Sequence, residues 1–391
     1  MMIIYPIPEL LPDHRARFIQ IINTCLGLAS QGVRVRLVAG IKKGYSEKDV
    51  FDFYGVSQPR NLELVRLPVL RREDERFLKV SWHGLFNIFL LLKLFSWRSE
   101  GDAPVLFLRH LKLAAFILKF KKMLKMPVIF EAHEVFHLNT GGKGREEKTR
   151  RLEKKVYRGS DSIIAITNSL KGCLIEMGIG EGLVSIAHDG VKEEWFDTSW
   201  KAPGEYICYA GSLHEWKGVD ELIGAMKYLP DERLVIVGGG ARLDRLKELA
   251  VGAGVGERVA FAGNVPHQSV PGYLSRAKVA VLPNIDKGLT RFSSPLKLFE
   301  YMASGVPIVA SDLQVFKEVL EDGRNALLAR PGDCKELACR IKELAGDHLL
   351  SLKIGGAARA DARGYTYANR AIKILDAINV TVAQRKKRGQ G

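Results

Sequence analysis

A turn that carries a lysine between glycines, GSLHEWKG at residues 211–218, is the first segment that could do chemistry. It follows a strand-like run, YICYA, and precedes an amphipathic segment typical of a helix that begins at Val219. Glycines let the backbone approach a ligand, and a helix N-terminus presents unpaired N–H groups and partial positive charge. With Lys217 beside them, these groups suit a diphosphate. The alternative is an ordinary turn with a surface lysine.

A second such segment follows the strand-like run VAVLP. Ser293 or Ser294 is expected to cap a helix that has Pro295 near its first position, and the free N–H groups of that helix again suit an anion. Glu300 lies in the same, otherwise apolar helix, where an unpaired carboxylate is costly. We therefore expect Glu300 to meet donors such as ribose hydroxyls. The alternative is an ion pair with Lys297.

In the first half of the chain, the strand-like run VIFEAH leads into Glu131–Glu134. In open parallel sheets, ligands bind beyond the carboxyl ends of the strands. His133 could therefore exchange hydrogen bonds with a polar substrate. The alternative is a structural histidine, and the neighbouring glutamates favour the ligand role only modestly.

Several other catalytic patterns are excluded by the sequence. The glycines at 238–240 do not complete a G-x-G-x-x-G fingerprint, because Leu243 stands at the third glycine's place, so a tight turn between strand and helix is expected. The sequence contains no Walker A lysine motif, no H-E-x-x-H and no G-x-S-x-G. These absences argue against P-loop, metalloprotease and serine-hydrolase chemistry.

The elements that must position these residues alternate between strand-like runs and amphipathic helices, as in parallel sheets covered by crossover helices. The pattern pauses at the polar segment 193–204 and restarts, and each half holds enough units for its own doubly wound sheet. We predict two tandem Rossmann-like α/β domains, 1–194 and 195–365, whose strand-end loops line one cleft if the domains face each other. Residues 6–12 are expected to form a proline-rich loop.

The composition is that of a globular protein, with 391 residues, 47% hydrophobic and 26% charged. Five scattered cysteines without a C-x-x-C pair favour a reducing cytoplasm over a disulfide framework. The N-terminus lacks the basic and long apolar regions of a signal peptide, so none is expected. The charge is strongly positive, with 59 Lys+Arg against 44 Asp+Glu.

A basic segment over 101–130 carries six lysines and arginines and only one acid, Asp102. It predicts either a surface that contacts anionic lipid at the inner membrane face or a solvated helix face. The most apolar run, 81–97, falls short of the ~20 clean residues of a spanning helix and favours a buried or interfacial one. The basic tail at 385–388 is expected to be a frayed end.

Taken in order, these loops resemble those of the family-4-type retaining glycosyltransferases of GT-B fold. GSLHEWKGVDELIGAM resembles the family's phosphate-binding turn, G-R-L-x-x-x-K-G, and LVIVGGG, RVAFAGNV, VAVLPN and SSPLKLFEYMASGVPIVASD follow in the family's order. In the first half, HRARFIQIINTCLGLASQGVRVRLVAG resembles the opening helix and second strand, EAHE the E-x-H-type strand end, and SIAHDGV the approach to the linker. The resemblance is strongest over 205–325 and weak over 45–125.

The resemblance implies that the second domain holds a nucleoside diphosphate sugar, with Lys217 neutralising the diphosphate and Glu300 binding the ribose hydroxyls. His133 would contact the donor sugar near its anomeric carbon. Asp189 and Gly190 would lie at the interdomain edge, and a last helix over 366–385 would cross back onto the first domain. The expected donor-binding residues are Gly211, Ser212, Lys217, Val265, Ser293, Ser294, Leu296 and Glu300, and the expected catalytic residues are His133, Lys217 and Glu300.

The chain departs from the family's pattern at three places. Ser212 stands where the phosphate turn usually has an arginine, and Phe292 stands where the first of two paired glutamates would be. Arg291 or Lys297 could take over the missing phosphate charge. The glycine pair usual after the first strand is replaced by the proline-rich segment 6–12.

From these residues we predict transfer of a sugar to a hydroxyl of a glycan or lipid-linked acceptor, with retained anomeric configuration, in polysaccharide or lipopolysaccharide synthesis. The leaving phosphate oxygen would accept the acceptor's proton, and no metal, other cofactor or nucleic-acid partner is expected. Two alternatives stay open. One is a nucleotide-sugar 2-epimerase of the same fold, and the other is a non-enzymatic basic protein that binds polyanions.

Overall fold

A computed structural model describes residues 1–69, 84–100, 104–140, 142–198, 200–201, 203–292 and 294–389. The chain divides into two compact units, unit 1 (Met1–His188 with Tyr367–Gly391) and unit 2 (Asp189–Thr366). The division falls at 188/189 rather than at the predicted 194/195. The boundary lies earlier because the segment after it packs on unit 2. Val191 and Trp195 lie in a buried cluster of unit 2, and the Val191 N–H donates to the Tyr365 carbonyl at 2.9 Å.

Unit 1 contains a seven-stranded sheet in the order β3-β2-β1-β4-β5-β6-β7, and all its strand pairs are parallel. The order reverses at β1, so the unit has the doubly wound topology that the alternating pattern predicts. The strands are β1 (Met2–Leu11), β2 (Arg34–Ile41), β3 (Leu62–Arg66), β4 (Pro104–Leu108), β5 (Val128–Ala132), β6 (Ser162–Ala165) and β7 (Val184–Ile186).

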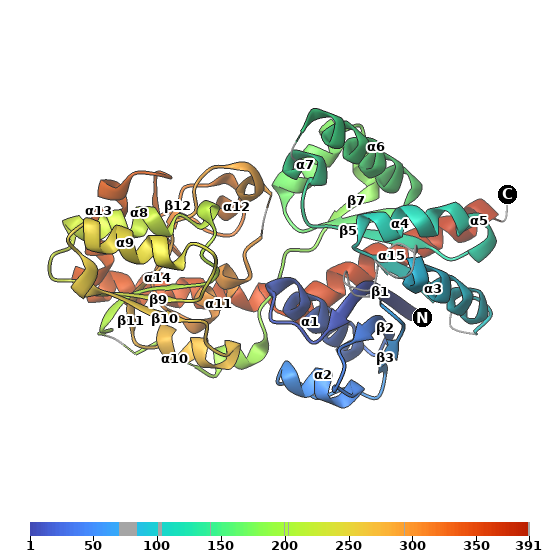
Figure 1. Cartoon of the computed structure of the whole chain (residues 1–391), viewed down its shortest axis with the longest axis horizontal. Helices are drawn as coiled ribbons and strands as arrows, with labels where there is room; N and C mark the ends of the chain where they lie inside the picture. The colour runs from blue at the N-terminus through green and yellow to red at the C-terminus, as the bar shows by residue number, and fades with distance from the viewer. Residues whose placement is uncertain are drawn as a thin grey trace. The chain divides into compact units, whose positions relative to one another are not determined.

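Helices cover both faces of this sheet (Figure 1). On one face, α1 and α15 share a buried cluster in which Phe18 and Ile22 of α1 lie with Ile374 and Ile378 of α15. The last helix therefore packs on the first unit. On the other face, α6 places its Tyr157 ring against Phe130 of β5. The helices are α1 (Ala16–Ser30), α2 (Glu47–Phe53), α3 (Gly84–Trp97), α4 (Leu111–Ile117), α5 (Lys121–Leu124), α6 (Lys143–Gly159), α7 (Asn168–Glu176) and α15 (Tyr367–Gly389).

Two predictions about the ends of unit 1 are wrong. The predicted loop at 6–12 is mostly strand, since β1 continues to Leu11. Its prolines are tolerated because β4 pairs only with Met2–Ile4, so the later part of β1 has β2 as its single neighbour there, with an irregular register. The basic tail does not begin to fray at its first residue: Arg385 donates to the Asp161 carboxylate at 2.9 Å and to the Met126 carbonyl at 2.8 Å.

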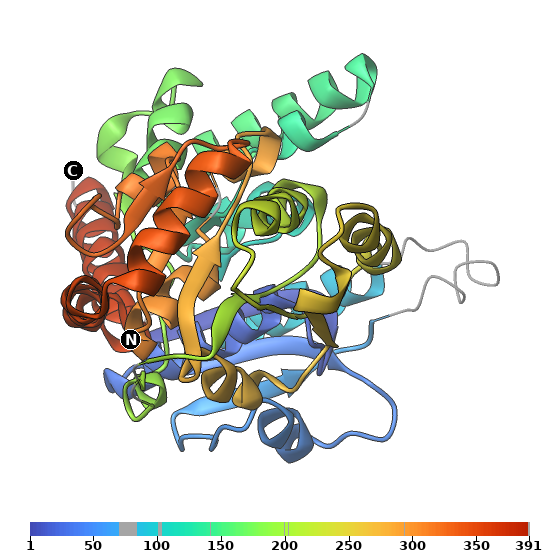
Figure 2. The same ribbon diagram turned by 90° about the vertical axis from the view of Figure 1, so that its left-hand side faces the viewer.

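Unit 2 contains a six-stranded sheet in the order β10-β9-β8-β11-β12-β13, again with parallel pairs. One buried layer joins the sheet to α8, α9 and α13, and a second joins its other face to α10, α11 and α14. Figure 2 shows strands of this sheet running between the two helix layers. The strands are β8 (Tyr206–Ala210), β9 (Leu234–Val237), β10 (Val259–Gly263), β11 (Ala277–Leu282), β12 (Ile308–Ser311) and β13 (Leu327–Ala329). The helices are α8 (Val219–Ala225), α9 (Leu243–Gly252), α10 (Val270–Leu274), α11 (Leu296–Ser304), α12 (Gln314–Lys317), α13 (Cys334–Gly346) and α14 (His348–Ala362).

Candidate functional site

The lysine-bearing turn leaves β8 at Gly211 and passes through a short 3-10 helix, η6 (Glu215–Lys217), before α8 begins. The sequence did not predict this 3-10 turn. Gly218 joins η6 to α8 with a φ of 65°, and a Cβ added there would lie 1.8 Å from the Pro283 carbonyl oxygen. Glycine is therefore required at 218, and the turn is pressed against the carboxyl end of β11.

Lys217 is held at the end of this turn with a half-buried side chain. Burial lowers the pKa of its ammonium to about 8. No carboxylate of the described residues forms an ion pair with it. A desolvated positive charge without a counter-ion is costly, so this ammonium is prepared for an anionic ligand.

A second lysine, Lys297 in the first turn of α11, is buried more deeply and is only 8% exposed. Its Nζ lies 3.8 Å from the centre of the Tyr209 ring, and nothing in the described part of the chain accepts a hydrogen bond from it. Burial, and then the nearby charge of Lys217, lower the pKa of Lys297 well below its ordinary value. The two ammonium groups therefore lie close enough to repel each other.

Two tyrosines fix the backbone between these lysines. The Ala210 N–H donates to the Tyr301 hydroxyl at 2.7 Å, which ties the end of β8 to α11. The Tyr209 hydroxyl donates to the Ser212 carbonyl at 2.8 Å. Sequence reasoning missed both residues.

The glycines at 238–240 support the same turn. The Gly211 N–H donates to the Val237 carbonyl at 2.8 Å, and the Leu213 N–H donates to the Gly239 carbonyl at 3.1 Å. A Cβ added at Gly238 would lie 2.0 Å from the Gly211 carbonyl oxygen. The prediction of a tight turn here, rather than a dinucleotide fingerprint, is confirmed. The glycines let the backbone at 238–240 pack directly against the backbone of the lysine-bearing turn.

Glu300 contacts a histidine and not the lysine considered as its alternative partner. Its Oε1 lies 2.8 Å from Nε2 of His267, which follows β10 in a short 3-10 helix, and the two side chains are 12% and 33% exposed. Burial alone would lower the pKa of His267, but the charge and hydrogen bond of Glu300 outweigh it and raise that pKa. Val265, on the same loop, packs partly buried against the core layer that contains α11.

The predicted serine cap of α11 is wrong. The helix begins at Leu296, and its N-cap is Pro295, which makes no side-chain capping bond. Pro295 has an extended backbone (φ −77°, ψ 123°), so the chain turns into the helix one residue later than predicted. Ser294 precedes the cap, and Ser293 lies outside the described residues.

Asn284 is a residue that sequence reasoning missed. It follows β11 directly, is 1% exposed, and neither polar atom of its amide has a hydrogen-bond partner among the described residues. Its Cα would lie 3.5 Å from a Cβ added at Gly218, so it stands beside the lysine-bearing turn. An unsatisfied buried amide at this place is an available contact for a polar ligand.

His133 lies in unit 1, directly after β5, and its Nε2 is 3.0 Å from the Glu131 carboxylate. Glu131 is fully buried; it accepts from the Tyr5 hydroxyl at 2.7 Å and pairs with the guanidinium of Arg370 in α15. Burial alone would raise the pKa of Glu131, but the charges of His133 and Arg370 outweigh it and hold that pKa far below its usual range. His133 is thus oriented by an ionised carboxylate, and its contact with a sugar stays a prediction.

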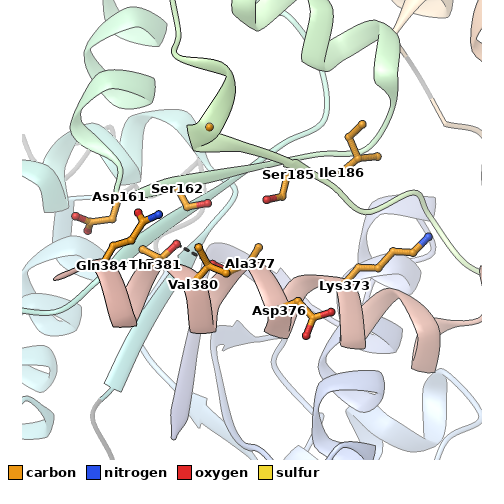
Figure 3. A pocket seen from close by; sticks show the side chains of 11 residues that line it. Asp161, Ser162, Ser185, Ile186, Lys373, Asp376, Ala377, Val380, Thr381 and Gln384 are labelled. Atoms are coloured by element: carbon orange, nitrogen blue, oxygen red, sulfur yellow. Dashed lines mark hydrogen bonds between the residues drawn. The ribbon is translucent and has the colours of Figure 1, made fainter. Parts of the chain in front are cut away.

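A groove of about 300 Å³ lies elsewhere in unit 1, between α15 and the strands β6 and β7. Figure 3 shows Ala377 and Val380 of α15 facing Ser162 and Ser185 across it. None of the predicted site residues lines this groove.

In unit 2, the structure brings the predicted residues Gly211, Ser212 and Lys217 together with Lys297 at the carboxyl end of β8, and Glu300 follows one helical turn along α11. In open parallel sheets this is the edge where ligands bind. Asp189 and Gly190, both buried, begin unit 2.

The chain is similar to known glycosyltransferases in both of its units. Residues 19–195 match a family model described as Glycosyltransferase Family 4, and residues 204–347 match one described as Glycosyl transferases group 1. The chain is 26% identical over 206 residues to an uncharacterized glycosyltransferase of Methanocaldococcus jannaschii, covering 49% of this chain and 51% of that protein. It is 27% identical over 297 residues to a phosphatidyl-myo-inositol mannosyltransferase of Mycobacterium leprae, covering 71% and 74%. The chain thus spans between about half and three quarters of the length of these two relatives.

Solved structures show the same fold. Sucrose-phosphate synthase from Thermosynechococcus elongatus superposes with a TM-score of 0.77 at 17% identity, covering 98% of this chain and 99% of that one. The Anabaena protein HepE in complex with UDP-glucose superposes with a TM-score of 0.73 at 15% identity, covering 97% and 100%. With both units matched by glycosyltransferase models and the whole chain sharing this two-sheet architecture, the chain belongs to the family-4-type glycosyltransferases of GT-B fold.

Proposed function

We propose that this protein is a retaining glycosyltransferase that moves a sugar from a nucleoside diphosphate sugar to a hydroxyl of a glycan or lipid-linked acceptor. The observation that carries the proposal is the half-buried Lys217, which has no ion-pair partner among the described residues and, like Glu300, lies within electrostatic reach of Lys297. Two lysines with a carboxylate one helical turn from Lys297 suit a diphosphate joined to a ribose.

The names of similar proteins support the two substrate classes. HepE is described in complex with UDP-glucose, and the Mycobacterium leprae relative is named for a mannosyl transfer to phosphatidyl-myo-inositol. A sugar nucleotide as donor and a glycan or lipid-linked hydroxyl as acceptor are therefore the substrates that we propose. Synthesis of a polysaccharide or lipopolysaccharide is the process in which such a transfer would take place.

In the proposed reaction, the bond between the anomeric carbon and the diphosphate oxygen breaks, and the electron pair leaves with the diphosphate. Lys217 stabilises the growing negative charge because its ammonium is already desolvated and fixed by the turn. The acceptor hydroxyl oxygen forms its bond on the same face of the sugar and gives its proton to the leaving phosphate oxygen. No carboxylate is assigned to the anomeric carbon and no metal is required, so this route differs from that of retaining glycosidases.

His133 is proposed to contact the donor sugar from unit 1. Glu131 lies 3.0 Å from its Nε2, and Arg370 and Tyr5 hold Glu131 in turn, so the ring has a fixed orientation. An imidazole that is held in one orientation after a strand end can hydrogen-bond a sugar hydroxyl while positive charge develops on the sugar ring.

The proposed function is tested with a panel of UDP-, GDP- and ADP-sugars. We expect one nucleotide class to raise the melting temperature, slow release of free sugar from that donor, and a free sugar whose first-formed anomer, followed by NMR, has the configuration of the donor. No nucleotide binding, or an inverted product, would contradict the proposal. An epimerised donor formed without acceptor would instead favour the epimerase.

We further propose that unit 1 contacts anionic membrane through an apolar surface formed by α3 and α5. Ile88, Phe89 and Leu92 of α3 are 52%, 44% and 60% exposed, and Met123 of α5 is 58% exposed. Arg98, just beyond α3, donates to the Met123 carbonyl at 3.1 Å, so the two helices adjoin. Exposed basic residues border this α3–α5 surface: Lys93, Arg98, Lys122 and Lys125. Exposed apolar side chains with cationic side chains near them suit an anionic lipid interface. No helix in the described part of the chain is long and apolar enough to span a bilayer.

The double variant Ile88→Ser/Leu92→Ser is expected to bind vesicles containing phosphatidylglycerol at least tenfold more weakly, because each buried aliphatic side chain contributes about 1.5–3 kcal/mol. Sedimentation with such vesicles, and with phosphatidylcholine alone, measures the effect. Leu349→Ser is the matched control, since Leu349 is 78% exposed in unit 2 and should not change binding. Equal sedimentation of all three proteins would exclude this surface as the membrane contact.

A further inference from the structure

We infer that Lys297, from α11, is a second cation for the donor's diphosphate beside Lys217. This inference rests on the proposed function and names a further binding residue of the same site.

The first support is the surroundings of the Lys297 ammonium. The side chain is 92% buried, yet its Nζ has no hydrogen-bond partner within the described residues and forms no ion pair there. An ammonium has three donors, and leaving them unsatisfied in a buried site costs several kcal/mol. The Tyr209 ring, whose centre lies 3.8 Å from Nζ, attracts a cation but cannot accept three hydrogen bonds. A ligand with anionic oxygens would satisfy them.

The second support is the position of the ammonium at the turn. A Cβ added at Gly211 would lie 2.2 Å from Lys297 Nζ and 2.6 Å from its Cε. The ammonium therefore occupies the space that a side chain at 211 would fill, and it lies directly against the first residue of the lysine-bearing turn. Glycine at 211 is required for this approach, which is a tighter constraint than an ordinary βα turn imposes.

The third support is that Arg291, the other candidate for the second cation, is exposed and already has an ion-pair partner. Arg291 is exposed, with 64% of its side chain accessible, and its Nε already donates to the Asp286 carboxylate at 3.3 Å. Lys297 is buried, lacks a partner among the described residues and adjoins Lys217. Of the two residues that the sequence offered as substitutes for the missing arginine, the geometry favours Lys297.

The charges around Lys297 predict a second, independent signature. The groups that act on it are Lys217 from η6, Cys208 and Tyr209 from β8, and Glu300 from its own helix. The two lysines disfavour each other's charge in the empty site, and a bound diphosphate would favour both. Binding should therefore be accompanied by proton uptake, because the bound anion raises the pKa of a lysine that burial had lowered.

Calorimetry with inorganic pyrophosphate, UDP and GDP tests the inference on the full chain. We expect Lys297→Met to weaken pyrophosphate and the preferred nucleoside diphosphate by about 10- to 100-fold, the effect of losing a hydrogen bond to a charged group. The matching nucleoside monophosphate should lose less. Arg291→Met is the matched control and should bind within about twofold of the wild type. Proton uptake, measured in two buffers of different ionisation enthalpy, should fall in Lys297→Met and not in Arg291→Met.

The same variants separate a binding role from a structural one. Removing a buried amine that has no hydrogen-bond partner among the described residues should leave the melting temperature of Lys297→Met equal to or above that of the wild type without ligand. Wild-type affinity and proton uptake in Lys297→Met would overturn the inference while leaving the proposed function intact. If the wild type itself binds neither pyrophosphate nor a nucleoside diphosphate, the proposed function fails first and this assignment fails with it.

Discussion

Replacing Lys217 with methionine is expected to lower kcat/KM for sugar transfer by about 100-fold or more, with most of the loss in kcat. The reason is that charge on the diphosphate grows as the bond to the sugar breaks, so the ammonium interacts more strongly with the transition state than with the bound donor. Steady-state transfer rates against donor concentration measure the two parameters. Lys227→Met, a change at an exposed lysine of the same unit, should leave both unchanged.

The pKa of Lys217 predicts the direction in which the rate of sugar transfer changes with pH. Because burial lowers the pKa of Lys217 to about 8, its ammonium is present below that pH and is lost as the pH rises through it. The kcat/KM of the wild type, which reports ionisations of the free enzyme, should therefore decline on the alkaline side near pH 8. Lys217→Arg, whose guanidinium does not titrate in this range, should keep whatever activity it has to higher pH. A near-normal rate in Lys217→Met, or an unchanged alkaline limb in Lys217→Arg, would remove Lys217 from the site.

Replacing Glu300 with alanine is expected to lower transfer at least tenfold, mainly through a weaker affinity for the donor. Hydrogen bonds from ribose hydroxyls to a carboxylate contribute about 1.5–3 kcal/mol, and this carboxylate is only 12% exposed. His267, 2.8 Å away, would also lose its partner and the cause of its raised pKa. Donor affinity by calorimetry and transfer rates together measure the effect.

A double-mutant cycle distinguishes a ribose contact from a structural pair with His267. Nucleoside diphosphate and its 2′,3′-dideoxy analogue are each measured against the wild type and Glu300→Ala. If Glu300 holds the hydroxyls, the wild type should prefer the ribonucleotide, and the variant should bind the two nearly equally. His267→Gln serves as the comparison, since it disturbs the pair but keeps the carboxylate. Equal preference in the wild type and Glu300→Ala would show that Glu300 does not touch the ribose.

Sequence periodicity predicted much of the fold because a parallel sheet buried on both faces requires continuous apolar strands. Runs such as YICYA and VAVLP appear as β8 and β11, and the final amphipathic segment appears as α15. The short strands β3 and β13 were missed because β3 includes charged residues, Glu63 and Arg66, and β13 spans only three residues. Prolines concealed the second half of β1, since their cost depends on how many neighbours the strand has.

The candidate site was predicted only in part, and the missing part depends on contacts between distant residues. The lysine-bearing turn could be recognised locally, but Ala210 and Tyr301 are 91 positions apart and the sequence gives no signal of their hydrogen bond. The same holds for His267 and Glu300, 33 residues apart. Lys297 could be named as a substitute cation from its type alone, whereas its burial against Tyr209 and Gly211 required the three-dimensional arrangement.

The route of the chain through unit 1 has a consequence for how the protein is made. Its last segment, Tyr367–Gly391, returns to a unit whose other residues end at His188. Arg370 in that segment pairs with the buried Glu131 and donates to the His188 carbonyl at 2.6 Å. During translation, unit 2 can emerge with all of its strands before residues 367–389 are made. The apolar sheet face of unit 1 and the Glu131 carboxylate stay uncovered until those residues follow. A chaperone that shields exposed apolar surface would therefore be needed longest by the half that leaves the ribosome first.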